Sequence, residues 1–201
     1  MIKATGSIAF FDFDGTITKR DTLFQIIKFF HGNLYFYLNL VILSPYFLLY
    51  KLKVIPNWKA KELVLTRFFG GIDVKTFEET CRKFSIEVIP HLLRPDAMSE
   101  IERLKSLGIR IIIVSASIEA WIKPWCDTLT IECIGTRLQV IDKKITGKIN
   151  GFNCYGPEKV NRILKFVDLA DYSDISAYGD SKGDIPMLEL ASKAHYRTFK
   201  D

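Results

Sequence analysis

Short apolar runs alternate with amphipathic helical segments along most of this chain, and this alternation constrains its fold more than any other feature. The runs Ser7–Asp12 and Ile109–Ser115 are dense in bulky apolar residues, which is typical of buried strands. The segment Pro95–Leu107 between them repeats apolar residues every three positions and stops at Gly108, as a helix with a C-terminal glycine does. The same patterns predict helix Ile118–Leu129, strand Ile131–Ile134, a hairpin of Arg137–Ile141 and Lys144–Ile149, helix Glu158–Asp168, strand Asp174–Tyr178, helix Asp184–Ala191 and strand His195–Phe199. The predicted fold is therefore α/β, a Rossmann-like, doubly wound parallel sheet.

One internal segment, residues 18–89, breaks this alternation because it contains only helical patterns. The expected helices are Asp21–Phe30, Leu34–Leu43, Pro45–Leu52, Lys59–Phe69 and Lys75–Ile86. The segment separates the first strand from the helix that leads to the second strand. We therefore predict a core of residues 1–17 and 90–201, with residues 18–89 inserted as an all-helical cap over the sheet edge.

Two pairs of aspartates follow predicted strands. Asp12 and Asp14 end the first strand, and Asp180 and Asp184 follow the strand at Asp174–Tyr178. Taken alone, Asp-Phe-Asp-Gly also suits an ordinary turn. However, the carboxyl ends of parallel strands meet in one crevice, where four carboxylates repel one another unless a cation binds. The two pairs together predict a Mg²⁺ site, because Mg²⁺ prefers carboxylate and water oxygens.

Four motifs, in this order, resemble those of the haloacid dehalogenase superfamily. They are Asp12-Phe-Asp14-Gly-Thr, Ser115 after an apolar run, Lys159 near the start of a helix, and Gly179-Asp180-x-x-x-Asp184. The helical insertion after the first motif is similar to the branch that includes phosphoserine phosphatase. This resemblance implies a phosphatase with the α/β fold predicted above.

The resemblance also implies the role of each aspartate. Asp12 is expected to attack phosphorus and form an aspartyl phosphate, and Asp14 to act as general acid and then general base. Mg²⁺ is expected to bind Asp12, the backbone carbonyl of Asp14 and Asp180, with Asp184 supporting that set. Carboxylate nucleophiles divide a difficult transfer into two easier steps, which suits these roles.

Three further residues are expected to bind the phosphoryl group. The resemblance implies that Ser115 and the amide of Ala116 donate hydrogen bonds to its oxygens, and that Lys159 neutralises charge between phosphate and nucleophile. From the sequence alone, Ser115 also suits an ordinary loop hydroxyl, and Lys159 an exposed lysine in a first helical turn.

Some positions depart from the phosphoserine phosphatase pattern. Tyr155-Gly156 stands where those enzymes usually have a lysine before the glycine, and Gly183 stands where they often have asparagine. Asp21 replaces the cap glutamate that holds the ammonium of the substrate. The resemblance therefore extends to the chemistry but not to phosphoserine as the substrate.

The cap contains an uncharged run of 22 residues, Phe29–Tyr50, which is long enough to span a bilayer. We expect two short helices broken at Ser44-Pro45 instead, lying in a membrane interface with Leu40, Ile42, Phe47 and Leu48 toward the lipid. Residues 18–89 hold eleven Lys/Arg and six Asp/Glu, which is the whole excess of the +5 net charge. The layout resembles the phosphatidylglycerophosphatase C family. A buried cap bundle and a dimer interface are the alternatives.

Composition and missing motifs limit the remaining function classes. The four cysteines are far apart, and the start of the sequence lacks the order of a signal peptide, which predicts reduced thiols in the cytoplasm. No zinc, Walker A or dinucleotide motif occurs, and no nucleic-acid partner is expected. We predict a Mg²⁺-dependent phosphomonoesterase acting on a phosphorylated small molecule or lipid, in peripheral contact with an anionic inner membrane surface. A phosphatase of a soluble, phosphoserine-like metabolite and a non-catalytic membrane- or partner-binding protein are the alternatives.

Overall fold

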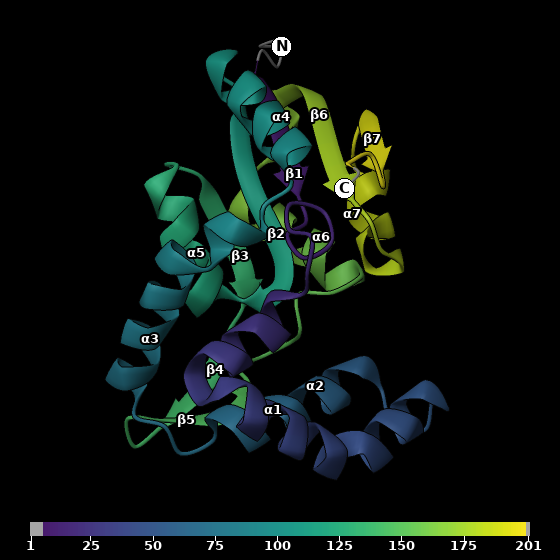
Figure 1. Cartoon of the computed structure of the whole chain (residues 1–201). Helices are drawn as coiled ribbons and strands as arrows, with labels where there is room; N and C mark the ends of the chain where they lie inside the picture. The colour runs from purple at the N-terminus through teal and green to yellow at the C-terminus, as the bar shows by residue number, and fades with distance from the viewer. Residues whose placement is uncertain (1–5, 200–201) are drawn as a thin grey trace.

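A five-stranded parallel sheet forms the centre of the molecule (Figure 1). The computed structural model describes residues 6–199. The strand order is β3-β2-β1-β6-β7, and each neighbouring pair is parallel. The strands are β1 (Gly6–Phe11), β2 (Arg110–Ile118), β3 (Glu132–Thr136), β6 (Tyr172–Gly179) and β7 (Lys193–Tyr196). The chain order reverses on either side of β1, so the predicted doubly wound sheet is confirmed.

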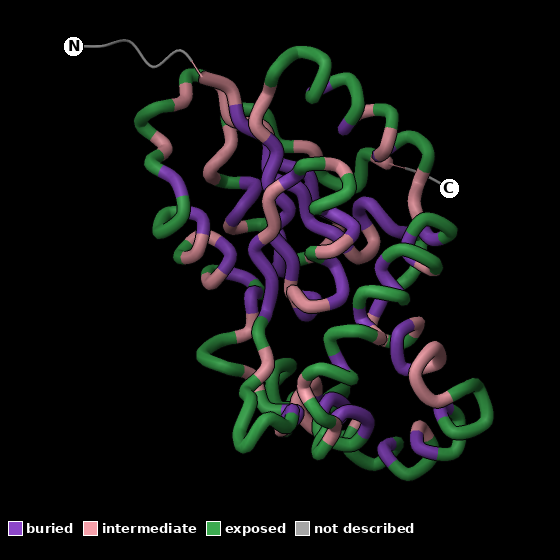
Figure 2. The backbone as a smooth tube through the Cα atoms, turned by 90° about the vertical axis from the view of Figure 1, so that its left-hand side faces the viewer, coloured by how far each residue is buried: buried purple, intermediate pink, exposed green. Residues whose placement is uncertain are grey.

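Helices cover both faces of this sheet. Alternate residues of β1 point to opposite faces, so each face contributes its own set of apolar side chains. Ala9 and Phe11 pack in one apolar cluster with α4 (Pro95–Ser106) and α5 (Glu119–Thr128). Ile8 and Phe10 pack in the other with α6 (Pro157–Phe166) and α7 (Ile185–Glu189). Figure 2 shows the resulting buried centre of the tube. The unbroken apolar run in β1 is explained by burial on both faces.

Three helices and a short 3₁₀ turn follow β1. They are α1 (Thr22–Lys51), α2 (Asn57–Phe69), α3 (Val74–Glu87) and η1 (Ile89–Leu92). Helices α1 and α2 lie at the end of the molecule opposite α4 (Figure 1). This agrees with the predicted helical character of the region.

The hairpin of β4 (Leu138–Ile141) and β5 (Lys144–Ile149) lies against these helices and not in the main sheet. Gly71 N donates to Ile145 O at 2.8 Å, and Ile145 N donates to Ile72 O at 2.8 Å. A hairpin that the sequence assigned to the core therefore contacts the helical segment of residues 18–89. The division into core and cap stays a prediction.

The expected break at Ser44-Pro45 was wrong. Helix α1 continues through Pro45, and its backbone leaves helical geometry at Gly32, where φ is 80° and ψ is 163°. Proline removes a backbone donor and leaves the carbonyl four residues earlier without its partner. Here Ser44 Oγ donates to the Val41 carbonyl at 2.7 Å, which satisfies that oxygen and lets the helix continue.

Candidate active site

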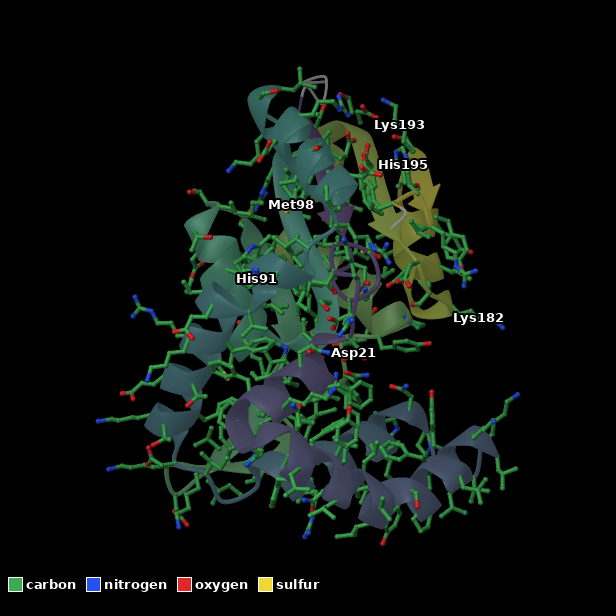
Figure 3. All side chains as sticks on the ribbon, viewed as in Figure 1. Asp21, His91, Met98, Lys182, Lys193 and His195 are labelled. Atoms are coloured by element: carbon green, nitrogen blue, oxygen red, sulfur yellow. The ribbon has the colours of Figure 1, made fainter. Side chains whose placement is uncertain are left out.

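A cavity of about 380 Å³ lies at the carboxyl ends of β1 and β2, between the sheet and helices α1 and α2. It brings together most of the residues predicted for the site, namely Asp12, Asp14, Ser115, Ala116, Lys159 and Asp184. Asp180 belongs to the same acidic cluster as Asp12 and Asp184. Asp21, labelled in Figure 3, lines the cavity where α1 begins.

Asp12 is a buried residue in the wall of this cavity. Its backbone N–H donates to Tyr178 O at 2.9 Å, which continues the parallel pairing of β1 with β6 and fixes the residue at the strand end. The residue is 6% exposed, and its carboxylate accepts a hydrogen bond from Thr16 Oγ1 at 3.3 Å. Burial raises the pKa of Asp12 to about 7, while the ammonium of Lys159 opposes that rise.

Lys159 is the cation beside Asp12, and it is only 1% exposed. Its ammonium donates to Asp12 Oδ1 at 2.5 Å and to Asp184 Oδ1 at 2.6 Å. A third donation, at 2.7 Å, goes to the carbonyl of Val114 in β2. Burial alone lowers the pKa of Lys159, but the two aspartates outweigh this and hold the pKa above its usual range. The alternative of an exposed first-turn lysine is therefore excluded.

Asp14 has a separate set of partners. Thr22 donates to it twice, from its backbone N at 2.8 Å and from Oγ1 at 3.2 Å, and Ser117 Oγ adds another hydrogen bond. Burial and then the charge of Asp21 raise the pKa of Asp14 to about 6, against the lowering effect of these hydrogen bonds. The two aspartates of one motif thus differ in environment, which suits different chemical roles.

Three carboxylates are placed to hold a metal ion. Asp12, Asp180 and Asp184 each offer one oxygen within 4.8 Å of the others. Three hard oxygen donors in a partly enclosed position fit a divalent cation such as Mg²⁺. The carboxylate of Asp14 is outside this group, so its predicted contribution through the backbone carbonyl stays a prediction.

The loop around the cluster keeps these carboxylates in position. Asp184 Oδ2 accepts hydrogen bonds from Ser181 N at 2.9 Å and Ser181 Oγ at 2.7 Å. Gly15 has φ +87°, and a Cβ there would lie 2.4 Å from Asp180 Oδ2. Glycine at position 15 is therefore required by both the backbone conformation and the approach of Asp180.

Two of the departures from the phosphoserine phosphatase pattern are coupled in space. A Cβ at Gly183 would lie 2.2 Å from the ring of Tyr155, so glycine makes room for that tyrosine. Gly156 N donates to Gly183 O at 3.0 Å and joins the two loops. Lys159 reaches the cluster from the first turn of α6, although the residue directly before Gly156 is Tyr155 and not a lysine.

Ser115 is buried at 1% exposure, and its hydroxyl accepts from Ser117 N at 3.0 Å. Strand β2 was expected to end at Ser115, but it continues to Ile118. Its pairing with β3 shifts register between Val114 and Ile118, which takes the intervening residues out of the regular ladder. The buried serine in the cavity wall is not an ordinary loop hydroxyl.

The sequence reasoning missed three residues of the site, Thr22, Ser117 and Lys61. Ser117 lies two residues after Ser115 on the same strand, so strand periodicity was an available signal. Lys61, on α2, donates to Ala116 O and, at 3.1 Å, to Asn153 Oδ1. Burial lowers the pKa of Lys61 to about 8, while the charges of Asp14 and Asp21 oppose the change. No sequence pattern identifies this lysine.

Comparison with known proteins places this site in a family. The haloacid dehalogenase-like hydrolase family matches residues 9–189. Protein CicA of Caulobacter vibrioides is 34% identical over 192 residues, which cover 94% of this chain and 85% of that protein. Probable phosphatase Rv3661 of Mycobacterium tuberculosis is 31% identical over 133 residues, covering 65% of this chain and 46% of that protein.

A solved structure shows the same fold. The apo form of phosphoserine phosphatase has a TM-score of 0.65 and 17% identity, and the match covers 93% of this chain and 84% of that one. The strand order, the aspartate cluster and the family match agree with one another. The chain therefore belongs to the haloacid dehalogenase-like hydrolase family.

Proposed function

We propose that this chain is a Mg²⁺-dependent phosphomonoester hydrolase that works through an aspartyl phosphate on Asp12. The observation that carries this proposal is the pair of aspartates in one cavity with separate partners. Asp12 is paired with the buried Lys159, whereas Asp14 is held by Thr22 and Ser117. This difference in partners supports Asp12 as the attacking carboxylate and Asp14 as the group that transfers protons. The similarity to a protein named a probable phosphatase supports this choice among hydrolases.

The reaction takes place in two steps. In the first, a carboxylate oxygen of Asp12 bonds to phosphorus, the bond from phosphorus to the leaving oxygen breaks, and Asp14 gives that oxygen its proton. In the second, Asp14 takes a proton from water, the water oxygen bonds to phosphorus, and the bond to Asp12 breaks. The products are an alcohol and inorganic phosphate, with Asp14 protonated again. Positioned proton transfer of this kind contributes about 10²–10⁴-fold to the rate.

The residues around Asp12 are suited to bind a phosphoryl group. Lys159 and Lys61 supply positive charge, and the Ser115 hydroxyl and the Ala116 amide are the proposed hydrogen-bond donors. Asp12, Asp180 and Asp184, together with the carbonyl of Asp14, would hold Mg²⁺. When bound, Mg²⁺ supplies charge neutralisation for the phosphoryl oxygens.

The cap side of the cavity favours a substrate with an apolar part. Phe24, Phe47 and Tyr50 of α1 face the cavity, and Lys61 and Lys159 are the cations among the described lining residues. A lipid phosphate such as phosphatidylglycerol phosphate fits this lining, and contact with the inner membrane surface would supply it. The second candidate is a soluble phosphoserine-like metabolite, for which Lys61 is the group available to pair with a carboxylate.

Metal removal tests the proposed chemistry. We expect hydrolysis of p-nitrophenyl phosphate to require Mg²⁺ and to be lost with a chelator, because the aspartate cluster and phosphate otherwise repel one another. Ca²⁺ should restore little activity, because its larger and more flexible coordination shell displaces phosphorus from Asp12. Phosphate release is measured before and after metal is added back. Full activity in the chelated protein would show that the cluster does not serve this purpose.

The charge of Asp21 offers a test of Asp14 as the general acid. Asp14 must be protonated in the first step, so kcat/KM for an alkyl phosphate should fall as the pH rises through about 6. Asp21→Asn removes a charge that raises the pKa of Asp14, and this fall should move to lower pH. Asparagine preserves the N-cap, in which Asp21 Oδ1 accepts from Leu23 N at 2.8 Å.

An aryl phosphate is the control for this pH experiment. Its leaving oxygen needs no proton, so its profile should keep the same alkaline limb in both proteins. An alkyl phosphate profile that Asp21→Asn leaves unchanged, or moves to higher pH, would rule out Asp14 as the acid.

A further inference from the structure

One side of α1 carries large apolar residues that the rest of the described structure, residues 6–199, does not cover. The outer face of α1 is defined as Leu34, Leu38, Val41, Ile42 and Leu48, together with the C-cap residue Leu52; these residues are 57–76% exposed. Their spacing of mostly three or four residues places them along one stripe of the helix. Single exposed apolar residues need no explanation, but a continuous stripe of this length marks an interaction surface.

The charge around this face has one sign. No aspartate or glutamate occurs from Thr22 to Lys61, a segment that contains five lysines. Lys51, Lys53 and Lys59 are exposed where α1 passes into α2, beside the exposed residues Val54 and Trp58. The apolar face therefore ends in a basic tip.

This charge distribution favours an anionic surface over a second copy of the chain. A two-fold contact places the same patch on both sides. Such a dimer would place the lysines of both copies in one interface. The segment from Thr22 to Lys61 has no carboxylate to pair with them. An anionic lipid surface instead attracts each lysine near it.

The packing of the opposite side of α1 argues against a helix that crosses a membrane. By length and composition α1 could span a bilayer, with a mean hydropathy of 1.3 over a window that is 28% buried. However, the buried Asn39 accepts a hydrogen bond from Arg67 Nε of α2 at 2.6 Å, and Phe36 stacks on Phe68. Crossing would place that polar pair in hydrocarbon, which is costly.

We propose that the outer face of α1 and its basic tip dock on an anionic phospholipid surface. In this orientation α1 lies in the interface plane, as amphipathic helices with one apolar side do. The same helix lines the catalytic cavity with Phe47 and Tyr50, so docking brings the cavity toward phosphomonoester headgroups in that surface. This choice of substrate rests on the proposed function, whereas the docking itself does not.

The structure also corrects the positions expected to face lipid. Ile42 and Leu48 are exposed, as expected. Leu40 packs against the core, and Phe47 packs against the core and lines the cavity, so neither faces outward. The test variant therefore combines Leu38→Gln, Val41→Gln and Ile42→Gln, and leaves the cavity unchanged.

Co-sedimentation with vesicles tests the docking. Wild type should bind vesicles of phosphatidylglycerol and phosphatidylcholine and bind less to phosphatidylcholine alone. The triple variant should partition at least about tenfold more weakly, because three apolar side chains no longer enter the lipid. Lys51→Gln with Lys59→Gln should reduce binding to the anionic vesicles by about fivefold for each lysine, and this part should disappear at high salt.

Two controls make the outcome decisive. Ile86→Gln, Leu107→Gln and Leu164→Gln together remove as much exposed apolar surface elsewhere and should bind like wild type. Hydrolysis of p-nitrophenyl phosphate should be equal in all variants, which separates docking from folding and from the proposed chemistry. Failure of wild type to bind vesicles, or binding that ignores the triple variant and lipid charge, would overturn the proposal. A dimer that only the triple variant abolishes, without vesicle binding, would assign the face to a second copy.

Discussion

Asp12→Asn is expected to reduce turnover by about 10⁴-fold or more, because an amide cannot attack phosphorus and no other carboxylate has the same position. Asp12 accepts a hydrogen bond from Lys159 in the wall of the cavity, and Asp14 is bound to different partners. The measurement is single-turnover hydrolysis of an aryl phosphate with Mg²⁺ present.

The control for this prediction is the fold of the variant. Lys159 keeps Asp184 as a partner at 2.6 Å, so the protein should remain folded, as shown by its thermal unfolding midpoint. Mass spectrometry must exclude deamidation of the new asparagine back to aspartate. Turnover close to wild type from intact Asp12→Asn protein would contradict the nucleophile assignment.

Lys159→Met is expected to lower both stability and activity. The Lys159 ammonium is buried between Asp12 and Asp184, and removing it leaves two carboxylates close together without their cation. Loss of one partner from a buried ion pair typically costs about 3–5 kcal/mol. We expect that loss in the free energy of unfolding, measured by urea denaturation with chelator present so that no other cation compensates.

Lys165→Met is the matched control, because Lys165 is exposed on the same helix, α6. Its free energy of unfolding should stay within about 0.5 kcal/mol of wild type, as is usual for surface substitutions. If Lys159→Met were as stable as Lys165→Met, the buried ion pairs would not have the structural role assigned to them.

The sequence predicted the core well because burial on both faces leaves a strong apolar signal. Strands β1 and β2 contain the unbroken apolar runs Ile8–Phe11 and Ile111–Val114, and their order along the chain was enough to predict a parallel sheet. The convergence of Asp12, Asp180 and Asp184 followed from the same topology, since parallel strands end at one edge.

The helical segment of residues 18–89 was harder to predict because its features depend on contacts between segments. The helix continues through Pro45 because Ser44 Oγ satisfies the Val41 carbonyl, which propensity rules do not include. Whether an apolar residue of α1 points outward, as Ile42 does, or packs inward, as Leu40 does, depends on where α2 lies.

The site residues Lys61 and Thr22 were missed for the same reason, because their roles depend on contacts between segments. Lys61 and Thr22 reach Ala116 and Asp14 only when α1 and α2 pack at the end of the sheet. Each of these residues is unremarkable in its own segment, so local patterns carry no signal for them. Their contribution is tertiary, and only the arrangement of α1 and α2 shows it.

Trapping the covalent intermediate tests directly whether Asp12 is the nucleophile. The Asp14→Asn protein is mixed with Mg²⁺ and a radiolabelled aryl phosphate. Asp12 should still attack the phosphorus of this substrate, because the aryl oxide leaves without a proton. Release by water should be slow, because its base is missing. After acid quenching, we expect close to one hydroxylamine-labile phosphate per chain, on the peptide that contains Asp12. Turnover without protein-bound phosphate in the wild-type and Asp14→Asn proteins, or phosphate on another residue, would contradict the assignment of Asp12 as the nucleophile.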